Sequence, residues 1–237
     1  MISNNIDNIE SRIEAACQRV GRNKSEITLI AISKTKPTSA IKNAYDSGII
    51  HFGENRVQEL VKKYEELDGN WGEDIKWHQV GHLQRNKVKY IIDKVSLIHS
   101  LDSIRLAKQI NREAEKKDLI SDVLIQVNIA NEESKFGIME EDLESFFQEV
   151  IKLPHIRVRG LMAIAPYVED AEKNRKHFKK MRNLFVDIKS KNHDNNIYRD
   201  SISSFDILSM GMTGDFEVAI EEGATMVRVG TGIFGNR

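Results

Sequence analysis

The sequence has few of the residues that build covalent frameworks or separate domains. Cys17 is its single cysteine, so neither a disulfide framework nor a cysteine-rich metal site can form. Only three prolines occur among 237 residues, and no Gly-, Ser- or Pro-rich tract suggests a linker. We therefore expect one domain over residues 1–237, in a chain suited to a reducing cytoplasm.

An excess of charge of one sign is also lacking. Lys and Arg number 35 against 36 Asp and Glu, for a formal net charge of -1. No overall positive field would therefore draw the protein onto nucleic acid or an anionic membrane. No apolar run approaches the roughly 20 residues of a membrane-spanning helix, and the N-terminus lacks the basic start and apolar stretch of a signal peptide. We expect a monomeric cytoplasmic protein that binds a small ligand.

Apolar residues at mostly three- and four-residue intervals predict an amphipathic helix at the start of the chain. They are Ile2, Ile6, Ile9, Ile13 and Val20. Gly21 follows them, and a glycine at this position is typical of a helix C-terminal cap.

From Ile27 onward, short β-branched runs alternate with longer amphipathic segments, which is the pattern of repeated βα units around a parallel sheet. Eight strands are predicted, at Ile27–Ser33, Ile49–Phe52, Ile75–Val80, Ser96–His99, Asp122–Asn128, Ile156–Leu161, Asp206–Ser209 and Thr225–Val229. Helices are predicted at Pro37–Ser47, Asn55–Leu67, Asn86–Asp93, Ser103–Lys117, Glu140–Lys152, Asp170–Lys191 and Phe216–Glu222.

Eight strands can close a barrel, and the chain length is typical of eight βα units. The expected fold class is therefore α/β, a single (β/α)8 TIM barrel with an extra N-terminal helix. A doubly wound open sheet remains the structural alternative.

Functional side chains of such a barrel lie at the C-terminal ends of its strands. The first predicted strand ends beside Lys34, and alternation places Ile30 and Ile32 on the same face as this lysine. An amine must lose its proton before it attacks an aldehyde, and partial desolvation or a nearby cation favours the neutral form. Lys34 is therefore a candidate Schiff-base lysine, and Lys135 after the fifth strand is a weaker one.

Two glycine clusters follow the last two strands, where barrels of this kind commonly bind phosphate. Backbone N–H groups at the start of a helix and nearby hydroxyls could hold an anion there. The candidates are Ser209, Gly211, Thr213 and Gly214 after strand seven, and Gly230, Thr231 and Gly232 after strand eight. Arg228 lies just before the second cluster, and an arginine at a pyridine nitrogen would weaken the ring as an electron sink. The alternative for Arg228 is an ion pair with a barrel carboxylate.

Six sequence blocks together resemble one known family over essentially the whole chain. They are AISKTKP, HFGENRVQE, KWHQVGHLQRNK, RGLMAI, SMGM and MVRVGTGIFG, in this order. The chain is similar in them to the pyridoxal phosphate homeostasis proteins, whose fold is related to the N-terminal domain of alanine racemase. The resemblance implies pyridoxal 5′-phosphate as the cofactor, control of the cellular pool of this cofactor as the function, and no clear enzymatic turnover.

The resemblance also implies roles for single residues. Lys34, rather than Lys36, would carry the cofactor, while Asn55 and Arg228 would face its ring. The phosphate would be surrounded by Ser209, Met212, Gly230 and Thr231. Thr213 keeps a hydroxyl where the family often has serine, and Arg56 stands where the family often has tyrosine.

Histidines are the other candidates for chemistry. His78 and His82 are four residues apart, but Gly81 and the strand before it argue against a shared helix face, and no third ligand is evident. We therefore expect no metal site. Hydrogen bonds or ring packing at the barrel mouth are the expected roles of His78 and His82, and a structural hydrogen bond is expected for His99.

Two enzyme functions remain as alternatives to a carrier that donates the cofactor to apo-enzymes. An amino-acid racemase needs a second base opposite the lysine, which in the racemase family is a tyrosine of an additional domain. We expect this domain to be missing, and Tyr167 is the nearest candidate substitute. An aldolase-like barrel, in which Lys34 captures a sugar-phosphate carbonyl, is the third possibility.

Overall fold

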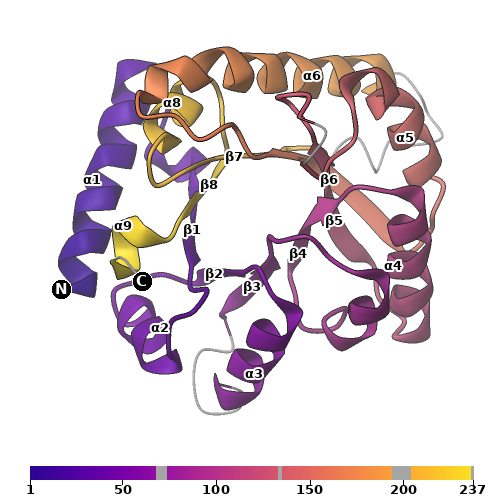
Figure 1. Cartoon of the computed structure of the whole chain (residues 1–237), viewed down its shortest axis with the longest axis horizontal. Coiled ribbons are helices and arrows are strands. Elements are labelled where there is room, and N and C mark those ends of the chain that lie inside the picture. Colours follow the sequence, from indigo (N-terminus) through magenta and orange to yellow (C-terminus); the bar gives the residue numbers. More distant parts are fainter. Residues whose placement is uncertain (68–73, 133–134, 194–203, 236–237) are drawn as a thin grey trace.

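The computed structural model describes residues 1–67, 74–132, 135–193 and 204–235, with the side chains of residues 192 and 193 left out. Eight parallel strands form a closed barrel in the order β1 to β8, with β8 paired to β1 (Figure 1). The strands are β1 (Thr28–Ile32), β2 (His51–Glu54), β3 (Lys76–Gln79), β4 (Leu97–Leu101), β5 (Ser121–Val127), β6 (Ile156–Ala163), β7 (Ile207–Met212) and β8 (Met226–Val229). The predicted barrel is confirmed, and the open sheet is excluded.

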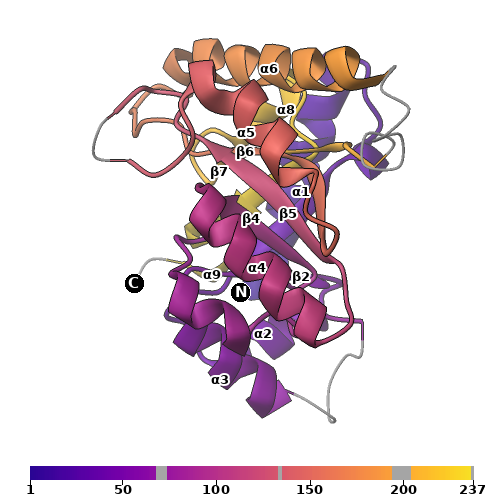
Figure 2. The ribbon, with the colours of Figure 1, turned by 90° about the vertical axis from the view of Figure 1, so that its right-hand side faces the viewer.

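The helices lie outside the barrel, and α4 packs on β5 and β6 (Figure 2). The α-helices are α1 (Ile2–Arg19), α2 (Thr38–Tyr45), α3 (Val57–Leu67), α4 (Ile104–Lys116), α5 (Leu143–Val150), α6 (Arg175–His193), α8 (Phe216–Glu221) and α9 (Thr231–Phe234). Short 3₁₀ helices are η1 (Lys24–Glu26), η2 (Arg85–Tyr90), η3 (Glu140–Asp142) and η4 (Ala171–Asn174). None of the helices in the described part of the chain is long and apolar enough to cross a membrane.

The α-helix predicted at Asn86–Asp93 is wrong, because this segment forms the 3₁₀ helix η2 and turns. A 3₁₀ helix brings residues three apart onto one face. Val88 and Ile91 are both fully buried, so this spacing suits the segment. The helices predicted from Glu140 and Asp170 begin instead with the 3₁₀ turns η3 and η4.

Alternation along the strands separates two apolar layers. Leu29 and Ala31 of β1 point outward and join the large core between the barrel and the helices. Ile30 and Ile32 point inward, where they pack with Val80. A second inward cluster contains Leu97, Leu124, Met162 and Ile207. The inward face of β1 therefore leads to Lys34, as the alternation predicts.

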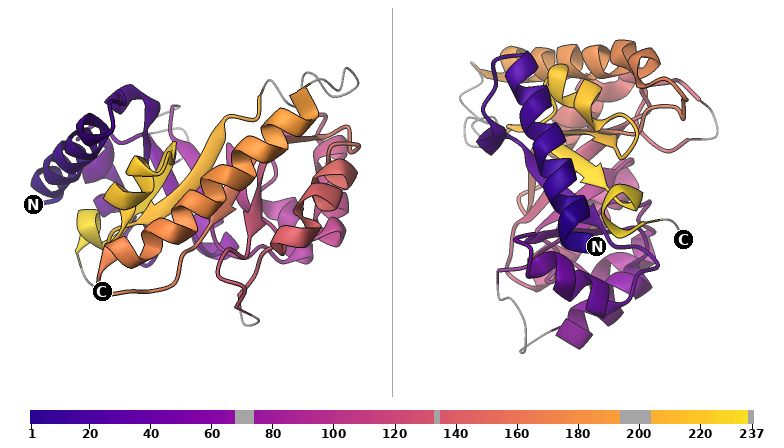
Figure 3. Two further views of the ribbon diagram at one scale, coloured as in Figure 1. Left: turned by 90° about the horizontal axis from the view of Figure 1, so that it is seen from above. Right: turned by 90° about the vertical axis from the view of Figure 1, so that its left-hand side faces the viewer.

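Helix α1 fills a gap in the ring of helices. It packs against α8, α9 and α2, beside the strand pair β8 and β1 (Figures 1 and 3). The segments α8 and α9 are only six and four residues long, so α1 takes the place that a helix after β8 would otherwise occupy. Its buried residues are Ile6, Ile9, Ile13, Ala16 and Cys17.

The end of α1 departs from one part of the prediction. Val20 does not continue the apolar face, since 42% of it is exposed. Gly21 has a φ of +67°, and Arg22 N–H donates to Cys17 O at 2.9 Å. This is the glycine-terminated cap that the sequence predicts.

Removing the apolar contacts of α1 should destabilise the whole barrel. Ile13 is 1% exposed, so Ile13→Ala is expected to lower the free energy of unfolding by about 2–5 kcal/mol, measured by urea denaturation. Val20→Ala, at the C-cap of the same helix, serves as the control and should change it by less than about 0.5 kcal/mol. Equal effects of the two substitutions would show that α1 is not docked as described.

Candidate functional site

A cavity of about 660 Å³ opens at the C-terminal ends of the strands. It is lined by segments that follow β1, β2, β3, β5, β6, β7 and β8. Seven of the eight predicted cofactor-binding residues line it, namely Lys34, Asn55, Met212, Thr213, Arg228, Gly230 and Thr231. The eighth, Ser209, is fully buried and does not line the cavity.

Lys34 lies in a tight turn directly after β1. Lys36 N–H donates to Ser33 O at 3.0 Å, which closes the turn around Lys34 and Thr35. Thr35 has a φ of +64°, a conformation that costs a β-branched residue on the order of 1 kcal/mol or more. Its N–H donates to Glu59 Oε2 of α3 at 2.8 Å. Contacts with α3 therefore hold the turn in a conformation that it would not otherwise favour.

A buried ion pair under the turn also helps to hold it in place. Lys63 Nζ of α3 lies 2.7 Å from Glu54 Oε1 of β2, and their side chains are 8% and 0% exposed. Both residues bind Ser33: Lys63 donates to its carbonyl oxygen at 2.8 Å, and the Ser33 hydroxyl donates to Glu54 at 2.6 Å. Burial raises the pKa of Glu54, while the hydrogen bonds from Lys63 and Ser33 oppose this shift. The residue before Lys34 is thus clamped through its backbone and its side chain.

Arg228 brings a buried positive charge to the other side of the cavity. It is 4% exposed and donates to Ser209 Oγ at 2.6 Å and to Ala163 O at 2.9 Å. Burial lowers the pKa of Arg228 to about 10, and Asp215 opposes this shift, so the guanidinium is charged at pH 7. No carboxylate of the described residues lies within 4.0 Å of it, so the alternative of an ion pair is not realised there.

The loops after β7 and β8 meet beside Arg228. Gly230 N–H donates to Thr213 Oγ1 at 3.3 Å, and both residues line the cavity. Met212 N–H donates to Asp215 Oδ1 at 2.7 Å, which shapes the first loop. A Cβ at Gly214 would meet no atom within 4 Å, so the backbone at this point faces open space. The two glycine clusters predicted to hold an anion therefore share one wall.

Asn55 is held by its backbone. A Cβ on Gly81 would lie 2.4 Å from Asn55 O, so only glycine permits this close approach. Gln79 Nε2 also donates to Asn55 O at 3.1 Å. Arg56, the neighbouring departure from the family pattern, is exposed and does not line the cavity.

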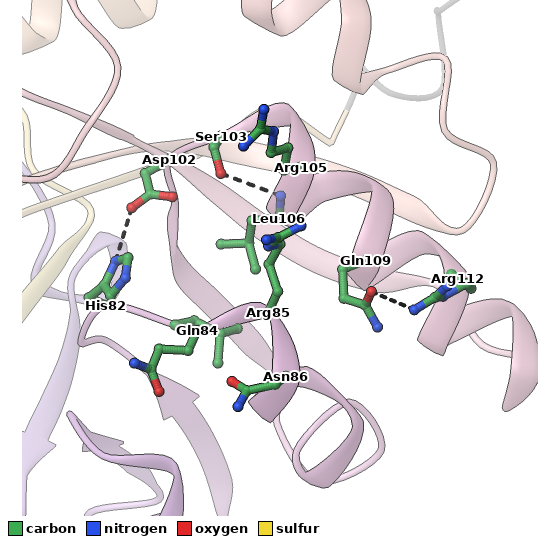
Figure 4. A pocket seen from close by; sticks show the side chains of 11 residues that line it. His82, Gln84, Arg85, Asn86, Asp102, Ser103, Arg105, Leu106, Gln109 and Arg112 are labelled. Atoms are coloured by element: carbon green, nitrogen blue, oxygen red, sulfur yellow. Dashed lines mark hydrogen bonds and ion pairs between the residues drawn. The ribbon is translucent and has the colours of Figure 1, made fainter.

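Lys135 is a second amine at the cavity, as the sequence suggested for a weaker candidate. It lies 2.6 Å from Glu132 Oε1, whereas no ion pair of Lys34 occurs among the described residues. The larger groove of about 790 Å³ lies elsewhere, over η2 and the start of α4, and none of the predicted site residues lines it (Figure 4).

His82 lines this outer groove and does not face His78. Its Nδ1 lies 3.1 Å from Asp102 Oδ2 (Figure 4), and its ring stacks on Phe136 with centroids 3.8 Å apart. His78 and His99 hydrogen-bond to each other inside the barrel at 3.0 Å. Among the described residues, no three acidic, histidine or cysteine side chains gather as a metal site.

Sequence reasoning missed the Glu54–Lys63 pair. One signal was available, because Lys63 lies on the buried face of α3 together with Val57, Leu60 and Leu67. A lysine in an apolar stripe needs a buried partner. Its identity depends on how α3 packs on β2, which the sequence does not state.

Comparison with known proteins agrees with this fold. A family model described as the alanine racemase N-terminal domain matches residues 5–237. The chain belongs to this family. It is 45% identical to the pyridoxal phosphate homeostasis protein of Aquifex aeolicus, over 98% of this chain and 96% of the relative. It is 40% identical to the protein of the same name from Escherichia coli K12, over 100% of this chain and 97% of the relative.

Solved structures show the same fold. PipY of Synechococcus elongatus PCC7942 with pyridoxal phosphate bound is 32% identical, with a TM-score of 0.84 over 99% of this chain and 100% of PipY. Alanine racemase of Clostridium difficile 630 is 13% identical, with a TM-score of 0.70 over 100% of this chain and 56% of the racemase. This second likeness concerns the fold alone.

The buried ion pair under Lys34 leads to a stability prediction. Lys63→Met leaves the Glu54 carboxylate buried without its cation, so we expect a loss of about 3–5 kcal/mol in the free energy of unfolding, measured by urea denaturation. Lys62→Met is the control: this lysine is on the same helix, 77% exposed and 3.7 Å from Glu66, and should change the free energy by less than about 1 kcal/mol. Glu54→Leu combined with Lys63→Met should recover much of the loss; if it does not, unpaired charge is not the cause.

Proposed function

We propose that this protein binds pyridoxal 5′-phosphate in the cavity at the barrel mouth and acts in the cell as a carrier and regulator of this cofactor. The observation that carries the proposal is the pairing, in one cavity, of the Lys34 amine with a buried arginine that has no carboxylate partner among the described residues. The names of the relatives and the cofactor bound to PipY support it.

The residues of the cavity suit the three functional parts of this cofactor. Its aldehyde can form a Schiff base with an amine, its pyridine ring carries a nitrogen acceptor, and its phosphate is an anion. Lys34 supplies the amine, Arg228 supplies a donor for the ring nitrogen, and the loops at Thr213 and Gly230 supply hydroxyl and backbone N–H groups for the phosphate. Asn55 would contact the ring from the end of β2.

The covalent step requires only Lys34 and the aldehyde. The Lys34 nitrogen adds to the carbonyl carbon, a C=N bond replaces the C=O bond, and the oxygen leaves as water. The clamped turn holds the lysine at the rim, and Arg228 adds a cation to the same cavity.

Arg228 also supports a carrier over a catalyst. A charged guanidinium that donates to the ring nitrogen discourages protonation there, so the ring remains a weak electron sink. We propose that the loaded protein is cytoplasmic and monomeric and donates the cofactor to apo-enzymes. Cys17 is free and buried, which suits a reducing compartment.

An amino-acid racemase is the second candidate. Tyr167 lines the cavity, as a second base would, but 94% of it is exposed. A base held in solvent is poorly positioned for proton transfer to a bound substrate. The likeness to alanine racemases concerns the fold only.

The first prediction from this proposal concerns the covalent link. After incubation with pyridoxal phosphate and borohydride reduction, mass spectrometry should find the added mass on Lys34 alone. Lys34→Ala should abolish both the adduct and the visible absorption of the bound cofactor. Lys135→Ala is the matched control, because it removes the other amine of the cavity, and it should retain both signals. An adduct on Lys135 in the Lys34→Ala protein, or loss of the adduct in the Lys135→Ala protein, would contradict the assignment.

The second prediction separates a carrier from a racemase. Loaded protein, freed of excess cofactor, should restore activity to an apo-enzyme that requires pyridoxal phosphate, and Lys34→Ala protein treated in the same way should not. The loaded protein should show no interconversion of L- and D-alanine by chiral chromatography. Measurable interconversion, lost in Tyr167→Phe, would favour the racemase instead.

A further inference from the structure

Five polar side chains form an unbroken series of hydrogen bonds across the inside of the barrel. His51 Nδ1 lies 2.9 Å from His78 Nε2, and His78 Nδ1 lies 3.0 Å from His99 Nε2. His99 Nδ1 lies 3.1 Å from Ser209 Oγ, to which Arg228 donates at 2.6 Å. We call this series the histidine chain. It connects β2, β3, β4, β7 and β8, and it ends at the candidate cofactor site.

The three rings of the histidine chain are neutral at pH 7. Burial lowers the pKa of His78 to about 3, with contributions from His51 and Lys76. Burial also lowers the pKa of His99 well below its usual value, with His78 and Arg228 adding to the shift. The pKa of half-buried His51 is lowered by burial and by Lys76. Each neutral ring offers one donor and one acceptor.

Arg228 sets the direction of these hydrogen bonds. Its guanidinium can only donate, so Ser209 Oγ accepts, and the Ser209 proton needs an acceptor of its own. Among the described residues, His99 Nδ1 is the hydrogen-bond partner that can take it. His99 then carries its proton on Nε2 and donates to His78. The reverse order would leave the Ser209 proton unpaired in a fully buried place, at a cost of about 1–3 kcal/mol.

The direction of the hydrogen bonds at His99 also determines the direction of the next two along the histidine chain. His78 accepts on Nδ1, so its proton is on Nε2 and points to His51 Nδ1. His51 is the first residue of β2, at the end of the barrel opposite the cavity. All three histidines are therefore expected in the same Nε2–H tautomer.

We propose that His99 and His78 are positioning residues that fix Arg228 at the cavity through Ser209. This inference rests on the proposed function, because the group that Arg228 meets there is the cofactor ring. Ser209 uses its donor on His99 and an acceptor site on Arg228, and it does not line the cavity. Its role is therefore to orient Arg228, and not to contact the phosphate as the family resemblance implies.

Positioning is needed because the other contact of Arg228 leaves it free to turn. That contact is one hydrogen bond from Nη2 to Ala163 O. A guanidinium with a single fixed acceptor can pivot about it. The Ser209 hydroxyl supplies the second acceptor, and His99 determines which way its lone pairs point.

Two substitutions at His99 separate the halves of its function. Asparagine places an amide oxygen near the Nδ1 position, so His99→Asn keeps the acceptor for Ser209 and loses the donor to His78. Glutamine reaches the Nε2 position, so His99→Gln keeps the donor to His78 and leaves Ser209 without an acceptor. We expect His99→Gln to weaken pyridoxal phosphate binding about tenfold or more and to shift the absorption maximum of the bound cofactor. His99→Asn should stay near wild type in both. His82→Asn is the control, because His82 lies outside the histidine chain and is bonded to Asp102 instead.

A measurement on cofactor-free protein tests the histidine chain itself. NMR of ligand-free protein with ¹⁵N-labelled histidine should show the Nε2–H tautomer for His51, His78 and His99 at pH 7. An Nδ1–H tautomer at His99 would overturn the inference, and so would equal affinity and spectra of the Asn and Gln variants. If wild-type protein binds no pyridoxal phosphate, the proposed function fails, while the tautomers still decide whether the chain has the stated direction. Melting temperatures of all variants show whether a loss of binding reflects unfolding.

Discussion

The pairing of β8 with β1 is the contact on which the candidate site depends. Ile30 pairs with Arg228 and Ala31 with Val229, so the two ends of the chain meet at one edge of the cavity. A Cβ at Gly230 would lie 3.4 Å from Ile32 Cβ, so the loop after β8 lies directly against the strand that leads to Lys34. Because α1 covers this seam from outside, the extra N-terminal helix takes part in forming the site.

Two buried polar networks hold the groups that face each other across the cavity. Outside the barrel wall, Glu54 and Lys63 bind Ser33 and so hold the turn at Lys34. Inside the barrel, the histidine chain holds Arg228. Burying polar groups without partners is costly, and here nearly every one of these atoms has a partner, although Glu54 Oε2 has none among the described residues. The networks thus stabilise positions that apolar packing alone would not select.

The sequence was sufficient for the parts of the structure that depend on local pattern. Alternation and turn residues predicted all eight strands, and the rule that barrel sites lie at strand ends brought Lys34, Thr213 and Gly230 to one cavity. The sequence could not predict the contacts that depend on packing between distant elements. Ser209 was expected at the phosphate because of its place in the motif, and its burial follows from the inward pleat of β7. His51 gave no signal, because its partner His78 is on another strand.

The histidine chain has a further consequence for the charge at the cavity. A carboxylate would orient Arg228 as firmly as Ser209 does, but it would also neutralise its positive charge. Neutral histidines and a hydroxyl orient the guanidinium and leave that charge unneutralised at the cavity. The barrel interior tolerates this arrangement because the rings are kept uncharged by burial, so one cation is buried instead of an ion pair with a second buried charge. A cofactor held against such an undiminished cation would keep its ring nitrogen unprotonated, which favours storage and transfer of the cofactor over carbanion chemistry.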